Sequence, residues 1–169
     1  MSRARSPLGG ELEQALAALD EAFDRKAWHG TNLRGSVRGL HARAAAWRPA
    51  PGRHNVWELV VHAAYWKYTV RRRLTGEKRG SFPLEGSNWF TRPAPGSRSS
   101  LEAAWRADLA LLGAEHRRLR AALAALPPSS LATLSPGTRH TLSRLVLGAA
   151  LHDVYHAGQI QLLKRLRSR

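Results

Sequence analysis

Apolar residues recur along this chain at steps of three and four, which is the spacing of one face of an α-helix. In residues 11–27 the repeat consists of Leu12, Ala15, Leu16, Leu19, Ala22 and Phe23. No segment shows a convincing alternation of apolar and polar residues, the pattern that is typical of a half-buried strand. The periodicity therefore predicts an all-α protein.

Proline and glycine divide this pattern into separate helices. The expected helices cover residues 11–27, 32–46, 55–74, 99–126 and 141–166. Four of them are long, and the second is a short extra helix. Because amphipathic helices bury their apolar stripes best against one another, we expect them to form a helical bundle.

Two helix starts carry the spacing of a capping box, in which a polar side chain precedes a glutamate by three residues. These pairs are Asn55 with Glu58 and Ser99 with Glu102. Between the second and third long helices, residues 76–98 are rich in glycine and proline and form a long loop. Loops of this length are usually functional or disordered. The aromatic residues of this loop favour packing against the bundle.

Length and composition limit the class of protein. The 169 residues fit a single domain, which we place at residues 11–166 after a flexible N-terminus at 1–10. The absence of cysteine removes disulfides and thiolate metal ligands, and it suits a reducing cytoplasm. No apolar run approaches the roughly 18 residues needed to span a membrane. We expect a soluble, cytoplasmic protein with no membrane partner.

The chain is strongly basic, with 27 Lys and Arg against 12 Asp and Glu and a formal net charge of +15. Such a surface attracts polyanions nonspecifically at low salt. The arginines are spread along every segment, and no zinc-finger, aromatic RNA-binding or phosphate-loop motif accompanies them. The charge therefore indicates bulk electrostatics more than specific nucleic-acid recognition.

His152 and His156 are four residues apart in the last helix, so both imidazoles lie on one helix face. Apolar residues precede and follow the pair on that face, which indicates that it points inward. His62 occupies an equivalent inward stripe on the helix over 55–74. Facing helices of a bundle can bring these three side chains together as ligands of one transition metal. A hydrogen-bond network without a metal is the alternative that satisfies such buried imidazoles.

Other residues near these histidines are weaker candidates. Gln159, one turn beyond His156, is placed to orient water or substrate. Four aromatic residues either form the walls of a pocket or simply pack in the core: Tyr65, Trp66, Trp89 and Tyr155. Glu58 and Asp153 are candidates for hydrogen-bonding the ligands or acting as general bases, although solvated surface positions are the simpler interpretation. The remaining histidines, which we expect at ordinary polar positions, are His29, His41, His54, His116 and His140.

The sequences around the three histidines resemble two motifs of the DinB-like (DinB/YfiT) superfamily. Residues 55–66, Asn-Val-Trp-Glu-Leu-Val-Val-His-Ala-Ala-Tyr-Trp, resemble the second-helix motif. Residues 152–160, His-Asp-Val-Tyr-His-Ala-Gly-Gln-Ile, resemble the last-helix motif. The similarity extends over about residues 11–166 and includes the Arg48-Pro49 turn and the loop around Asn88-Trp89-Phe90.

This resemblance implies a four-helix up-and-down bundle of unusual connectivity that is often a homodimer. It also implies a divalent metal, commonly zinc or nickel, at the positions of His62, His152 and His156. Family functions range from thiol-dependent S-transferases to metal-dependent hydrolases acting on small molecules. Because the chain lacks cysteine, any reacting thiol would come from the substrate.

Two hypotheses about function follow. The first is a metal-dependent enzyme of hydrolase or thiol S-transferase type, since three histidines leave coordination positions open. The second is a non-enzymatic basic bundle that binds nucleic acid or another polyanion and uses the metal only as a brace.

Overall fold

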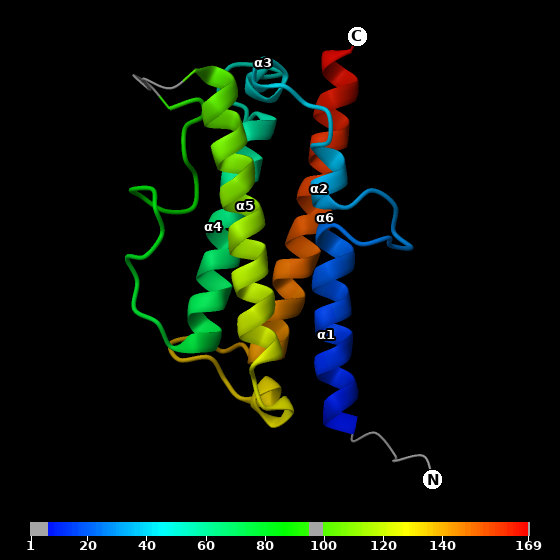
Figure 1. The fold of residues 1–169 in the computed structure, drawn as a ribbon, viewed down its shortest axis with the longest axis vertical. Coiled ribbons are helices and arrows are strands. Elements are labelled where there is room, and N and C mark those ends of the chain that lie inside the picture. Colours follow the sequence, from blue (N-terminus) through cyan, green and yellow to red (C-terminus); the bar gives the residue numbers. More distant parts are fainter. Residues whose placement is uncertain (1–6, 95–99, 169) are drawn as a thin grey trace.

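The computed structural model describes residues 7–94 and 100–168, and this part of the chain is helical without a β-strand. Four long helices form the body of the molecule (Figure 1). They are α1 (Pro7–Phe23), α4 (Val56–Thr75), α5 (Leu101–Ala124) and α6 (Leu142–Arg167). The short elements are α2 (Leu33–Ser36), α3 (Ala42–Ala46) and the 3₁₀ helix η1 (Pro128–Ala132). The prediction of an all-α fold is confirmed.

The two predicted capping boxes differ in outcome. At the start of α4, Glu58 N–H donates to Asn55 Oδ1 at 2.8 Å and Asn55 N–H donates to Glu58 Oε2 at 3.4 Å, as predicted. At the start of α5, Ser100 is the capping residue, while Ser99 lies outside the described residues. The carboxylate of Glu102 instead accepts from Ala42 N–H at 2.9 Å, at the beginning of α3.

Two of the predicted helices differ markedly from the observed ones. The first helix begins at Pro7 and ends at Phe23, instead of covering 11–27; residues 1–6 of the predicted flexible end lie outside the described residues. The single short helix predicted over 32–46 is two helices, α2 and α3. Gly39 separates them with a φ of 75°, a left-handed conformation that interrupts an α-helix.

The four long helices do not simply alternate in direction. In Figure 1, α1 and α6 run one way and α4 and α5 run the other way. Side-chain contacts agree with a shared direction of α4 and α5. Trp57 of α4 donates a hydrogen bond to Asp108 of α5. Further along both helices, Lys67 of α4 contacts His116 of α5. The loop after α4 runs back along the bundle, which allows α5 to start at the same end as α4 (Figure 1).

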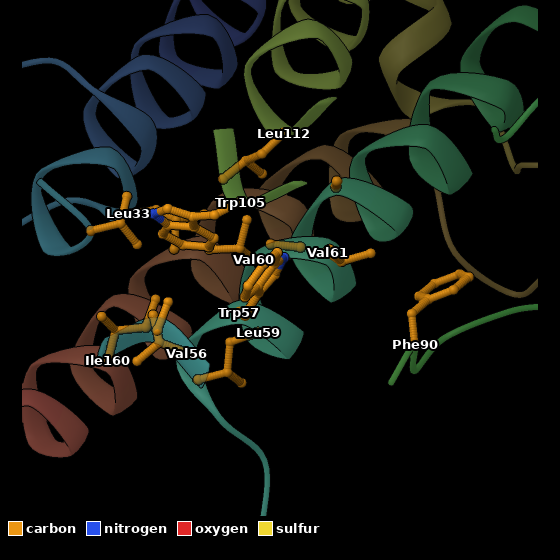
Figure 2. Close-up of a cluster of buried hydrophobic side chains, with 14 of the residues drawn as sticks. Leu33, Val56, Trp57, Leu59, Val60, Val61, Phe90, Trp105, Leu112 and Ile160 are labelled. Atoms are coloured by element: carbon orange, nitrogen blue, oxygen red, sulfur yellow. The ribbon is translucent and has the colours of Figure 1, made fainter. Parts of the chain in front are cut away.

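The core is centred on α4, which is buried along most of its length. Figure 2 shows Trp57 and Val60 of α4 packed near Trp105 and Leu112 of α5, with Ile160 of α6 close by. The Trp57 and Trp105 rings meet edge to face with centroids 5.3 Å apart, a favourable aromatic geometry. Within the described residues, no helix combines the length and apolar character needed to cross a membrane.

Candidate metal centre

The three histidines singled out in the sequence come together between α4 and α6. The Nε2 atom of His152 lies 3.1 Å from Nε2 of His62 and 2.9 Å from Nε2 of His156. One ligand atom from each ring lies within 4.8 Å of the others. His62 and His156 are buried, and His152 is half-buried. Spacing and periodicity therefore predicted this histidine cluster (His62, His152 and His156) correctly.

Two hydrogen bonds fix which nitrogen of each buried ring faces the cluster. His62 Nδ1–H donates to the backbone carbonyl of Asn88 at 2.8 Å, and His156 Nδ1–H donates to Gln159 Oε1 at 2.6 Å. Both acceptors are carbonyl oxygens, so the Nδ1 atoms carry the protons. The lone pairs of both Nε2 atoms are consequently directed into the cluster. This is the tautomer that a metal-ligating histidine adopts when its other nitrogen is held by an acceptor.

The arrangement leaves a lone-pair conflict that a cation would remove. His152 Nε2 can carry one proton and donate it to one neighbour, which leaves the in-plane lone pair of the other ring's Nε2 facing the cluster without a donor. Protonation does not relieve this conflict easily, because burial lowers the pKa of His62 to about 4 and that of His152 to about 3. Burial also lowers the pKa of His156. Three neutral imidazoles with converging nitrogens fit a divalent cation.

Asn88 and Trp89 of the long loop contact His62 and fix its ring. Asn88 adopts a φ of 65°, a left-handed conformation that asparagine tolerates better than most residues. Its side-chain oxygen accepts from Trp66 Nε1–H at 3.0 Å, while its carbonyl binds His62. Trp89 is stacked between His62 at 3.8 Å and His54 at 3.6 Å, measured between ring centroids. Sequence reasoning named Trp89 as a candidate pocket wall, assigned no role to Asn88 and expected His54 at an ordinary polar position.

The aromatic candidates separate into two groups. Trp66, Trp89 and Tyr155 are each more than a third exposed, and each ring lies close to a histidine of the cluster. They border the cluster on its solvent side. Tyr65 is buried and packs against Phe82 and other aromatic residues, so its role is packing.

Glu58 is not a solvated surface residue, and that prediction was wrong. Its carboxylate is buried, ion-paired with Arg48 and hydrogen-bonded to His54 Nδ1 at 3.0 Å. Burial by itself raises the pKa of Glu58, but the hydrogen bonds from Arg48, His54 and the Arg92 N–H lower it below its usual value. Glu58 therefore supports the start of α4 and positions His54, which in turn stacks on Trp89.

Asp153 is also buried, contrary to the surface position preferred for it from sequence. It forms an ion pair with Lys67 of α4, and both side chains are 1% exposed. Burial raises the pKa of Asp153 to about 6 although Lys67 opposes the shift. The pair links α4 to α6 directly behind His152. Nothing in the local sequence of either helix identifies the other partner, because the two residues are 86 positions apart.

His116 was expected at an ordinary polar position, and this prediction was wrong as well. The ring is buried, stacks on Phe23 at 3.8 Å and lies 3.4 Å from Lys67 Nζ. Burial and the positive charge of Lys67 lower its pKa to about 3; Asp20 opposes this shift, and Arg120 and Arg117 add to it. The polar groups behind the cluster thus continue across the bundle core to α5.

The fold and this site define a class of protein: a helical bundle that gathers three neutral imidazoles between two of its helices. The family model described as the DinB superfamily matches residues 23–160. The chain belongs to the DinB superfamily. No curated protein and no solved structure matches it significantly.

Proposed function

We propose that this protein binds one divalent metal ion through His62, His152 and His156 and acts as a metal-dependent enzyme of hydrolase or thiol S-transferase type. The observation that carries the metal site is the convergence of three Nε2 atoms, two of them with lone pairs fixed by Nδ1 hydrogen bonds. Zinc and nickel are the expected metals, since both accept neutral imidazole ligands.

A bound metal would supply Lewis acidity toward a water or thiol at a coordination position that the histidines leave open. The chain itself supplies the ligand geometry through Asn88 and Gln159. Trp66 and Trp89 form the half-exposed border across which a small molecule would approach. The chain has no cysteine, so a thiol mechanism requires that the substrate carry the sulfur.

The test is a substrate screen with protein loaded with Zn²⁺ or Ni²⁺, using ester, amide and thiol-transfer substrates. We expect the wild-type protein to turn over one of these classes and His62→Ala to lose both metal and turnover. His29→Ala is the matched control, because His29 is exposed and lies outside the cluster. Turnover by metal-free His62→Ala at the wild-type rate would contradict the proposal.

The net charge of +15 favours a second candidate function, in which the bundle binds nucleic acid or another polyanion and the metal only stabilises it. Binding to a fluorescent DNA duplex at two salt concentrations tests this function. Affinity that persists in His62→Ala and at physiological salt would support it. Binding that disappears near physiological salt would show only bulk electrostatics.

We further propose that the protein is a homodimer formed through an apolar face on α6. This α6 apolar face consists of Leu147, Leu151, Tyr155, Leu162 and Leu166, each between 42% and 63% exposed. Every exposed position of α6 from 147 to 162 is uncharged. Apolar surface of this extent, about 28 Å long at 1.5 Å per residue, is typical of protein interfaces.

The face is also complementary to itself. In an antiparallel pair of α6 helices centred on position 153, Leu151 would meet Tyr155 of the second copy and Gly148 would meet Gly158. Such reciprocal pairing is what a two-fold interface requires. Light scattering should give a dimer mass for the wild-type protein and a monomer for Leu151→Glu. Leu134→Glu, at a 65% exposed leucine outside α6, should remain a dimer; a monomeric wild-type protein would contradict the assignment.

A further inference from the structure

A concave surface lies away from the histidine cluster, on other helices of the bundle. It is a hollow of about 670 Å³ lined by the end of α1, by α2 with the turn after it, and by α5. The cluster instead lies between α4 and α6 (Figure 1). No residue of the cluster lines this hollow. Its volume is in the range of small-molecule sites.

Missing side chains explain why the surface is hollow here. Gly35, Gly39 and Gly113 are among the lining residues. A Cβ atom at Gly39 would meet nothing within 4 Å, so the space beside it is open. At Gly113 the nearest atom to an added Cβ is the flexible end of Arg117, at 3.3 Å.

The floor of the hollow is apolar. Phe23, Val37 and Leu112 line it, and each belongs to the buried core. Leu40 and Leu109 are partly buried and extend this surface outward. A ligand with an apolar body would cover the part of this floor that solvent reaches, chiefly at Leu40 and Leu109, and such burial is favourable in proportion to the area covered.

The rim of the hollow is positively charged. Arg34, Arg38 and Arg117 line it together with Asp24, the single acidic residue among the described lining residues. Asp24 pairs with Arg34 at 3.2 Å. No acidic group of the described chain lies within ion-pair distance of Arg38 or Arg117, so both guanidinium groups are free to pair with a ligand. Guanidinium groups bind carboxylates, like phosphates, in a two-pronged geometry.

We propose that this hollow, the arginine hollow, binds an organic anion with an apolar body, such as a medium-chain carboxylate. The apolar floor selects the body, and Arg38 and Arg117 select the charge. Neither feature is sufficient for tight binding by itself. An inorganic anion leaves the apolar floor exposed to water, and a neutral apolar molecule leaves both arginines unpaired. The inference does not depend on the proposed metal chemistry, which involves other residues.

Calorimetric titration with three probes tests the proposal: decanoate, acetate and decanol, each below the concentration at which it aggregates. We expect decanoate to bind at least tenfold more tightly than either acetate or decanol. Acetate or decanol binding as tightly as decanoate would overturn the assignment, because one feature would then be sufficient. Absence of decanoate binding would overturn it as well.

Variants locate the binding. Arg38→Gln/Arg117→Gln should weaken decanoate binding at least tenfold, and Gly113→Leu should block it by filling the hollow. Arg106→Gln is the matched control, since Arg106 is exposed on the same helix but does not line the hollow. His62→Ala should bind decanoate as the wild type does, which separates this site from the metal centre. Decanoate binding that survives both hollow variants would place the ligand elsewhere and overturn the proposal, provided that circular dichroism shows folded variants.

Discussion

Replacing Lys67 by methionine should destabilise the protein by about 3–5 kcal/mol, the usual loss when one partner of a buried ion pair is removed. Methionine keeps most of the side-chain volume, has a sulfur in place of Cδ and lacks the ammonium group. Asp153 is then left in a site where it is 1% exposed and where its Oδ1 already has no hydrogen-bond partner. The remaining neighbours of Lys67, a ring nitrogen of His116 and the face of Phe23, carry no charge to replace it.

The size of the loss expected for Lys67→Met depends on the burial of the ion pair. Exposed ion pairs contribute about 0–1 kcal/mol because water screens them. Arg34 and Asp24 form such a pair, with side chains 68% and 32% exposed, so Arg34→Met should cost less than about 1 kcal/mol. The double variant Lys67→Met/Asp153→Leu removes both buried charges and should recover most of the loss, since apolar replacement of a buried pair is often neutral.

Urea unfolding followed by circular dichroism at pH 7.5 measures all four proteins without added metal. The reasoning predicts a large loss for Lys67→Met, recovery in the double variant and little change for Arg34→Met. A loss below about 1 kcal/mol for Lys67→Met would refute it, because the pair would then behave as an exposed one. A double variant no more stable than the single one would show that the loss comes from packing and not from the unpaired carboxylate.

Three further predictions concern protonation, metal proximity and ligand orientation. The pKa of His116 is lowered from 6.5 to about 3, so between these pH values the unfolded chain binds a proton at His116 that the folded chain does not bind. As the pH falls below 6.5, His116 should therefore lower the free energy of unfolding by about 1.4 kcal/mol per pH unit. His116→Gln should show a shallower fall between pH 6.5 and 4 in urea titrations, and identical slopes would contradict this. Binding of Ni²⁺, an open-shell ion, should quench tryptophan fluorescence less in Trp89→Phe than in the wild type, because Trp89 is stacked on His62. Trp28→Phe, at a fully exposed position, should retain the metal-dependent quenching. Equal quenching in all three proteins would be inconsistent with this stacking. Gln159→Leu removes the acceptor of His156 and should weaken metal binding by roughly 10- to 100-fold in calorimetry, with unchanged affinity as the opposing result.

Local features of the sequence were sufficient to predict the four long helices and the histidine cluster. The capping box of Asn55 and Glu58 depends on residues three apart, and the pairing of His152 with His156 depends on residues four apart. The inward stripe of α4 then identified His62. In each case the evidence lies within one helix, where 3.6-residue periodicity relates sequence to geometry directly.

Non-local contacts account for what could not be predicted. Glu58 looked exposed because Arg48, which neutralises it, comes from the segment before α4. Asp153 looked exposed because Lys67 belongs to another helix. The shared direction of α4 and α5 depends on the path of the loop between them, which periodicity does not specify (Figure 1). Buried charges are predictable only when both partners are known, since each is tolerated only as part of a pair.

Metal stoichiometry tests the central claim most directly. Protein purified without an affinity tag is analysed by plasma mass spectrometry, and the apoprotein is titrated with Zn²⁺ and Ni²⁺ by calorimetry. The structure predicts one metal per chain for the wild type and for His29→Ala, and none for His62→Ala or His152→Ala/His156→Ala. A wild-type protein that contains no metal and is not stabilised by either ion would contradict the assignment of the three converging histidines as a metal site.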